Sequence, residues 1–128
     1  MHFIGFEIDT IEAGRIEGHL NFEDHHKQQN DFLHGGLSAT LLDVVSGFAA
    51  YSLVEEGAQV FTVEAKVNYY KPGIGEVFYA HGRVDKPGRL FHFCQSEIFY
   101  LKDGQKVIVA KGNTTMAVVS KDHVSTNG

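Results

Sequence analysis

One segment, from Gly35 to about Leu53, constrains the fold more than any other part of the 128-residue chain. Its apolar residues recur at helical spacing, and Asp43 is the single strongly charged residue well inside it. A helix that is apolar on nearly all sides must be surrounded by other elements, so we expect it at the centre of the molecule. Small residues along the helix permit close approach of other backbone segments; they are Gly36, Ser38, Ala39, Ser46, Gly47 and Ala50.

Segments on both sides of this helix alternate between apolar and polar residues, which is typical of half-buried strands. Two short strands are expected around a turn at Gly14, a long strand at 61–69, and further strands at about 76–86, 90–101 and 106–119. Pro-Gly or Asp-Gly turns separate the last four strands, so we expect antiparallel neighbours in a four-stranded meander. The sequence therefore predicts an α+β domain in which a curved sheet packs around one helix.

Length and charge exclude several other kinds of protein. The chain has the size of one domain, which we place at residues 1–119 and which a short polar tail follows at 120–128. A net charge of −5 is the wrong sign for general affinity to nucleic-acid phosphates. No apolar run reaches the ~20 residues that span a bilayer. The lone Cys94 and the absence of a secretion signal indicate the cytoplasm.

The start of the central helix and its one charge are the strongest chemical signals. Gly35 and Gly36 leave the free N–H groups of the first turn sterically open, and the helix dipole adds about half a positive charge there. Such a position can polarise a carbonyl, although a Gly pair also serves simply as a tight turn into a helix. Burying the Asp43 carboxylate is costly unless the group is paired. Asp43 therefore indicates a function, a buried ion pair or access to a cleft.

Helix geometry separates these two groups within one chain. Gly35 and Asp43 are eight residues apart, so about 12 Å of helix axis lies between them. An Asp side chain cannot close that distance, and both groups reach one carbonyl only if the Asp comes from a second helix that runs antiparallel beside the first. Because one helix covers only one face of a sheet rich in Phe and Val, we expect a homo-oligomer, either a dimer or a dimer of dimers.

Three motifs resemble those of a known family. They are the run His34-Gly35-Gly36 with Asp43 nine residues after the His, the strand segment TVEAKVNYYKP at 62–72, and the hairpin segment GRVDKPGR at 82–89. Over about residues 18–119 the chain resembles the PaaI-like acyl-CoA thioesterases of the hotdog fold, which belong to the superfamily of 4-hydroxybenzoyl-CoA thioesterase. The resemblance implies a curved antiparallel sheet wrapped around one long helix, an active site at a dimer interface, and an acyl-CoA substrate.

The resemblance also implies roles for individual residues. The N–H of Gly35 would polarise the thioester carbonyl, Asp43 would act as general base or nucleophile, and Thr62 would place the hydrolytic water. Thr62 is also an ordinary strand residue, and His34 is as consistent with capping the helix or orienting the loop as with touching the thioester. Gln28 stands where the family commonly has Asn, and it keeps the amide group on a longer arm.

Basic side chains at turns are candidates for binding the phosphates of coenzyme A. Such side chains are equally common as solvated surface residues. With two neighbouring glycines, the candidate set for substrate and coenzyme A binding is Gly36, Lys71, Lys86, Gly88 and Arg89.

We interpret the chain as a thioester hydrolase that converts a small-to-medium or aromatic acyl-CoA to free acid and coenzyme A. Two other functions stay open. One is a hotdog hydratase or dehydratase of 3-hydroxyacyl thioesters, which needs an acid/base pair such as His and Asp. The other is a non-catalytic acyl-CoA binding protein. We expect no metal, because His25, His26 and His34 lack metal-ligand spacing, and no cofactor besides the coenzyme A of the substrate.

Overall fold

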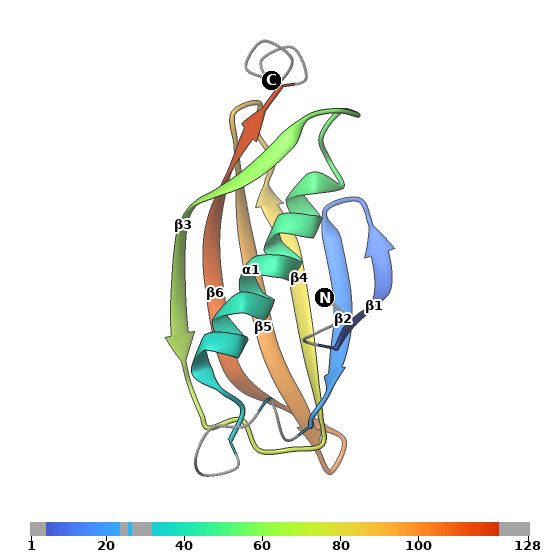
Figure 1. The fold of residues 1–128 in the computed structure, drawn as a ribbon, viewed down its shortest axis with the longest axis vertical. Helices are drawn as coiled ribbons and strands as arrows, with labels where there is room; N and C mark the ends of the chain where they lie inside the picture. The colour runs from blue at the N-terminus through green and yellow to red at the C-terminus, as the bar shows by residue number, and fades with distance from the viewer. Residues whose placement is uncertain (1–4, 24–25, 27–31, 121–128) are drawn as a thin grey trace.

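The computed structural model describes residues 5–23, 26 and 32–120, and its elements follow the expected order (Figure 1). A β-hairpin comes first, the helix second and four longer strands last. The elements are β1 (Phe6–Glu12), β2 (Arg15–Asn21), α1 (Gly35–Tyr51), β3 (Gln59–Tyr69), β4 (Val77–Lys86), β5 (Phe91–Lys102) and β6 (Gln105–Val119). α1 lies across one face of a single six-stranded sheet that curves around it, which confirms the predicted α+β architecture.

The sheet order is β1-β2-β4-β5-β6-β3, and every neighbouring pair is antiparallel. The predicted meander is therefore wrong for one strand, because β3 crosses to the far edge and pairs with β6 instead of β4. The connection from β3 to β4 does not form a tight hairpin, since its backbone bonds to other segments. Tyr70 N–H donates to the Val109 carbonyl, and the Gly73 carbonyl accepts from Leu33 N–H. Within the described part of the chain, β3 keeps one unpaired edge.

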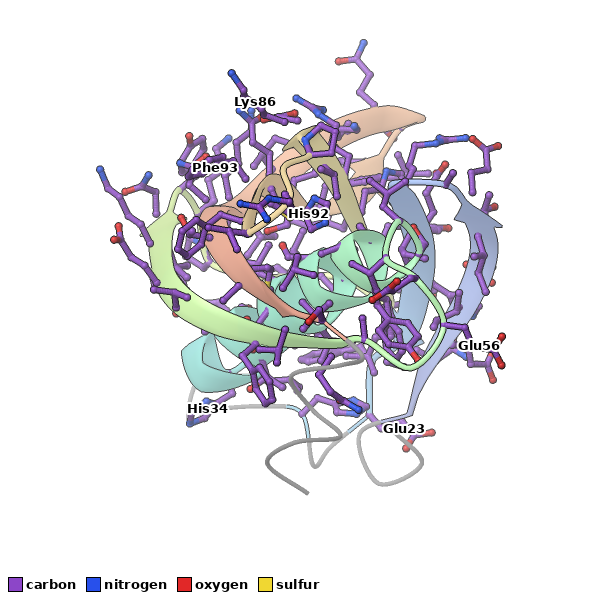
Figure 2. The ribbon with its side chains drawn as sticks, turned by 90° about the horizontal axis from the view of Figure 1, so that it is seen from above. Glu23, His34, Glu56, Lys86, His92 and Phe93 are labelled. Carbon is purple, nitrogen blue, oxygen red and sulfur yellow. The ribbon has the colours of Figure 1, made fainter. Side chains whose placement is uncertain are left out.

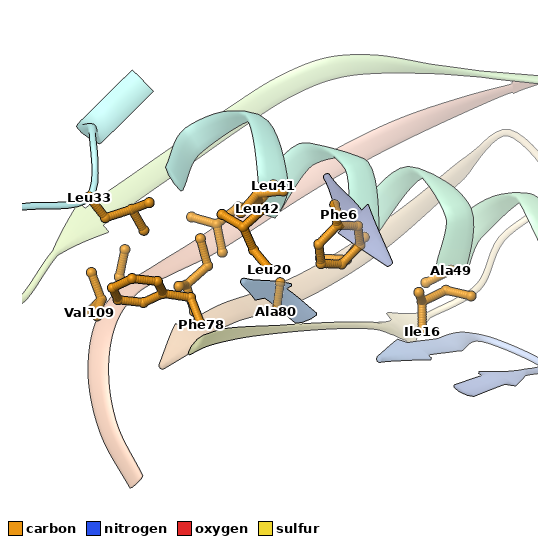
Figure 3. Close-up of a cluster of buried hydrophobic side chains, with 13 residues drawn as sticks. Phe6, Ile16, Leu20, Leu33, Leu41, Leu42, Ala49, Phe78, Ala80 and Val109 are labelled. Atoms are coloured by element: carbon orange, nitrogen blue, oxygen red, sulfur yellow. The ribbon is translucent and has the colours of Figure 1, made fainter. Parts of the chain in front are cut away.

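Close contact between α1 and the sheet depends on small residues in the strands. A Cβ atom at Gly82 of β4 would lie 2.6 Å from the carbonyl carbon of Val45, so helix backbone meets strand backbone at that point. Strand backbone therefore does approach α1 closely, but at this point the small residue belongs to the strand and not to the helix. Large apolar side chains from α1 and the strands fill the rest of the interface (Figure 3); among them are Phe6, Ile16, Leu20, Leu41, Leu42 and Phe78.

One face of α1 is not covered within a single chain, which corrects the expectation that the helix is surrounded on all sides. Phe48 and Tyr51 on α1 are 43% and 54% exposed. Both side chains line a groove together with Val60 and Thr62 of β3, so the uncovered face of α1 lies beside an edge strand of the sheet. Among the described residues, no helix has the length and apolar character needed to cross a membrane.

Candidate active site

Asp43 and Thr62, two of the predicted site residues, are in direct contact. Asp43 lies in the middle of α1 and Thr62 near the start of β3, and the Thr62 hydroxyl donates to Asp43 Oδ1 at 2.7 Å. The same hydroxyl lies 3.4 Å from the sulfur of Met116, which is opposite Thr62 on β6. Pairing of β3 with β6 therefore brings the hydroxyl to the helix carboxylate.

The environment of Asp43 differs from the buried one that the sequence indicated. Its side chain is half-buried, on the side of α1 that faces β3, and none of the ion pairs among the described residues includes it. Of the three explanations for this carboxylate, access to a cleft fits the structure, and a buried ion pair does not.

The cleft beside Asp43 is an apolar groove between α1 and β3. Its volume is about 360 Å³, and Asp43 and Thr62 line it on the side where they meet. Most of the other lining residues are apolar or aromatic; they are Val44, Gly47, Phe48, Tyr51, Val60 and Met116, with Gln59 as the polar exception. The groove has the character of a site for an apolar group that ends near a carboxylate and a hydroxyl.

His34 caps the start of α1. Its backbone is extended, and its Nδ1 accepts from the N–H of Gly36 at 3.0 Å. A Cβ atom at Gly36 would lie 3.2 Å from the His34 ring, so the second glycine makes room for the cap. This geometry corrects the expectation that both glycines present open N–H groups, because the Gly36 N–H is occupied. Of the possible roles of His34, capping is the one that the structure displays.

Gly35 keeps an open N–H at the first position of α1. None of the hydrogen bonds within the described residues starts from this N–H. A Cβ atom at Gly35 would make only ordinary contacts, at 3.7 Å or more, with the ring of Tyr69, and the residue lacks a positive φ. Among the described residues, therefore, no backbone strain or close contact requires glycine at this position.

Tyr69 is a residue of this region that the sequence analysis missed. It ends β3, and its hydroxyl donates to the Gly35 carbonyl at 2.9 Å. One feature of the sequence could have pointed to Tyr69. It lies two residues after Val67 in β3, so the two side chains are on the same face of the strand. That pattern predicts an inward ring but does not identify the atom that its hydroxyl contacts.

The structure does not bring the candidate coenzyme A residues together within one chain. Lys71 borders a hollow of about 420 Å³ that Gly35 also lines, at the start of α1. Gly88 and Arg89 border a different hollow of about 300 Å³, beside Leu53 at the other end of the helix. Figure 2 shows Lys86, on the same turn, on the opposite side of the molecule from His34.

The remaining candidate residues either have contacts that explain them structurally or lie outside the described residues. Gln28 and His25 lie outside the described residues, whereas His26 is buried and its Nδ1 accepts from the Glu23 N–H at 2.9 Å. Among the residues that the structure describes, no group of three or more His, Cys, Asp or Glu side chains is placed to hold a metal ion. Cys94 is buried, and burial raises the pKa of its thiol to about 11, which agrees with a packed residue rather than a nucleophile.

The chain is similar in sequence and in fold to proteins described as thioesterases or esterases. Human acyl-coenzyme A thioesterase 13 is 29% identical over 112 residues, which are 85% of this chain and 78% of that protein. The chain spans only 61% and 54% of two proposed esterases, from Saccharolobus solfataricus and Halobacterium salinarum, to which it is 27% and 30% identical. The crystal structure of a thioesterase family protein from Silicibacter pomeroyi superposes with a TM-score of 0.89 at 38% identity, covering 93% of this chain and 88% of that one.

The superposition confirms the hotdog fold that the resemblance implied, with one helix against a curved antiparallel sheet of six strands. The sequence pattern of the thioesterase superfamily matches residues 30–107, a stretch that contains the helix, Asp43 and Thr62. Because this match covers more than half of the chain, the chain belongs to the thioesterase superfamily.

Proposed function

We propose that this chain hydrolyses an acyl-CoA thioester to the free acid and coenzyme A. The observation that carries the proposal is the contact between Asp43 and Thr62 in the wall of an apolar groove. A second supporting feature is the open N–H of Gly35 at the positive end of the same helix. A carboxylate, a hydroxyl, an apolar groove and an open N–H donor are the groups that acyl transfer to water needs.

In the proposed reaction Asp43 acts as general base. The Thr62 hydroxyl donates to Oδ1 and holds the carboxylate so that its other oxygen takes a proton from water. The water oxygen attacks the carbonyl carbon, and the charge that develops on the carbonyl oxygen is stabilised by a Gly35 N–H and the helix dipole. The C–S bond then breaks, the acid is released, and the coenzyme A thiolate takes up the proton. No metal or redox group takes part in these steps.

Each proposed site is built from two subunits. About 12 Å of helix axis separates Gly35 from Asp43 in one chain, so a single helix cannot present both groups to one carbonyl. The uncovered face of α1, with Phe48 and Tyr51, lies beside the unpaired edge of β3. Both features are covered when a second copy packs antiparallel against this side, and a two-fold axis then creates two equivalent sites.

The same arrangement accounts for the separated basic residues. When Gly35 of one helix lies beside the middle of an antiparallel partner helix, the second half of the partner helix continues past Gly35. Lys71 of one subunit and the Lys86–Arg89 turn of its partner then lie toward the same end of the dimer. These cations would bind the phosphates of coenzyme A, and the groove of about 360 Å³ would take a small-to-medium or aromatic acyl group. A single free cysteine fits the reducing cytoplasm that we propose as its location.

A thiol-release assay over short-chain, long-chain and aromatic acyl-CoAs tests the proposal. We expect release from the short-chain or the aromatic substrates, and Asp43→Asn should lower kcat by about 10²–10⁴. Asp103→Asn is the matched control, because Asp103 is an exposed carboxylate in the β5–β6 turn. Circular dichroism should show the same fold for both variants.

Three results would contradict the proposal. Binding of acyl-CoA without thiol release would indicate a binding protein. Formation of an enoyl thioester from a 3-hydroxyacyl-CoA without hydrolysis would indicate a hydratase or dehydratase. Hydrolysis by Asp43→Asn within threefold of the unaltered protein would remove Asp43 from the mechanism.

A further inference from the structure

The peptide that joins Gly35 to Gly36 is held at both of its polar ends. The hydroxyl of Tyr69, the last residue of β3, donates to its carbonyl at 2.9 Å. Its N–H, which belongs to Gly36, donates to His34 Nδ1 at 3.0 Å. One side chain comes from the sheet edge and the other from the residue before the helix, so this peptide is restrained from two independent directions.

The preceding peptide carries the open N–H of Gly35. Its carbonyl, which belongs to His34, accepts from the Ser38 N–H at 3.0 Å as part of the first turn. Only the two backbone torsions of Gly35 lie between the two peptides, and glycine torsions are less restricted than those of any other residue. The Gly35 N–H therefore depends for its direction on this one bond to Ser38 and on how firmly the second peptide is held across the two Gly35 torsions.

We infer that Tyr69 and His34 are positioning residues that clamp the Gly35–Gly36 peptide and thereby fix the direction of the Gly35 N–H. The inference rests on the proposed function, in which that N–H receives the thioester oxygen. Hydrogen-bond donors stabilise a developing charge well when they are already oriented and need no rearrangement. Tyr69 acts through Gly35, and the His34 ring acts through Gly36.

Strand β3 consequently holds both groups of the proposed site, the Asp43 carboxylate and the Gly35 backbone. Thr62 near its start bonds to Asp43, and Tyr69 at its end bonds to Gly35. In the proposed dimer, each site therefore receives a Gly35 held by β3 of one subunit and an Asp43 held by β3 of the other. Deleting one hydroxyl at a time tests the two hydrogen bonds separately.

The activity test compares two neighbouring tyrosines. Tyr69→Phe removes the hydroxyl and keeps the ring, and we expect kcat to fall about 2- to 10-fold while KM and the urea midpoint stay unchanged. Tyr70→Phe is the matched control, because the hydrogen bonds within the described residues do not include the Tyr70 hydroxyl. His34→Ala should also lower kcat, and His34→Asn should recover most of the loss because Asn is a good helix-capping acceptor.

Backbone ¹⁵N relaxation of Gly35 and Gly36 tests the clamp without substrate. We expect Tyr69→Phe and His34→Ala to increase the motion of these two amides and to leave the middle of α1 unchanged. Unaltered relaxation in Tyr69→Phe, or an equal loss of kcat in Tyr70→Phe, would overturn the inference. If the unaltered protein releases no thiol, the proposed function fails, and the relaxation data alone then decide whether the peptide is clamped.

Discussion

Replacing Thr62 with valine deletes one hydroxyl from the proposed site and keeps the shape of the side chain. The hydroxyl donates to Asp43 Oδ1 at 2.7 Å, a short bond to a charged group. Hydrogen bonds to charged groups contribute about 1.5–3 kcal/mol. If this energy serves to orient the base in the transition state, kcat should fall by about 10- to 150-fold. Steady-state thiol release measures kcat and KM for each variant.

Thr62→Ser is the control, because serine keeps the hydroxyl and loses only a methyl group. We expect Thr62→Ser to retain kcat within a few fold, and we expect both variants to change KM little, since the hydroxyl acts on the carboxylate. Thr62→Val with kcat within threefold of the unaltered protein would refute the reasoning. An equal loss of kcat in both variants would also refute it, because the loss would then not come from the hydroxyl, which serine keeps.

Three further predictions follow from other contacts. Replacing Lys86 and Arg89 together with Ala should mainly raise KM for acyl-CoA and weaken the salt dependence of binding; an unchanged KM at low salt would make both ordinary surface residues. Cys94, whose buried thiol has a pKa of about 11, should react with iodoacetamide at pH 8 more than about 100-fold slower in the folded protein than in urea, and comparable rates would contradict its burial. Gly82→Ala should destabilise the protein by about 1–3 kcal/mol in urea unfolding, because the new Cβ meets the Val45 backbone at 2.6 Å, whereas unchanged stability would contradict the close contact.

Element types and their order were predictable because hydrophobic periodicity reports burial directly. The helix was expected to reach about Leu53 and instead ends at Tyr51. Its end depends on a tertiary contact, since the Ser52 hydroxyl donates to the Ala49 carbonyl and accepts from the Gly14 N–H, both at 2.7 Å. Gly14 is far from Ser52 in the sequence, so a local sequence pattern could not have indicated this hydrogen bond.

The position of β3 was not predictable from its turn residues. A Pro-Gly pair after the strand is typical of a hairpin, but the connection bonds to Leu33 and Val109 and leads β3 away from β4. The contact between Asp43 and Thr62 depends on that crossover, so periodicity alone did not bring the two together. Both residues could be identified as candidates from the resemblance to a known family. The hydrogen bond between Tyr69 and Gly35 could be identified only from the three-dimensional structure.

Mixing two inactive variants tests the central claim, that each site combines Gly35 of one subunit with Asp43 of another. One variant is Asp43→Asn and the other is Gly35→Pro, which deletes the donor N–H at the first helical position, where proline is favoured. The extended backbone of His34, with ψ of 130°, suits the residue before a proline. Each variant alone should be inactive in thiol release, before and after unfolding and refolding.

Refolded together in equal amounts, the two variants should form hybrid dimers in which one site carries both changes and the other site carries neither. Random pairing should restore about a quarter of the activity of the unaltered protein, because about half of the dimers are hybrids and each has one intact site. An inactive mixture in which native mass spectrometry detects folded hybrids would contradict the shared site.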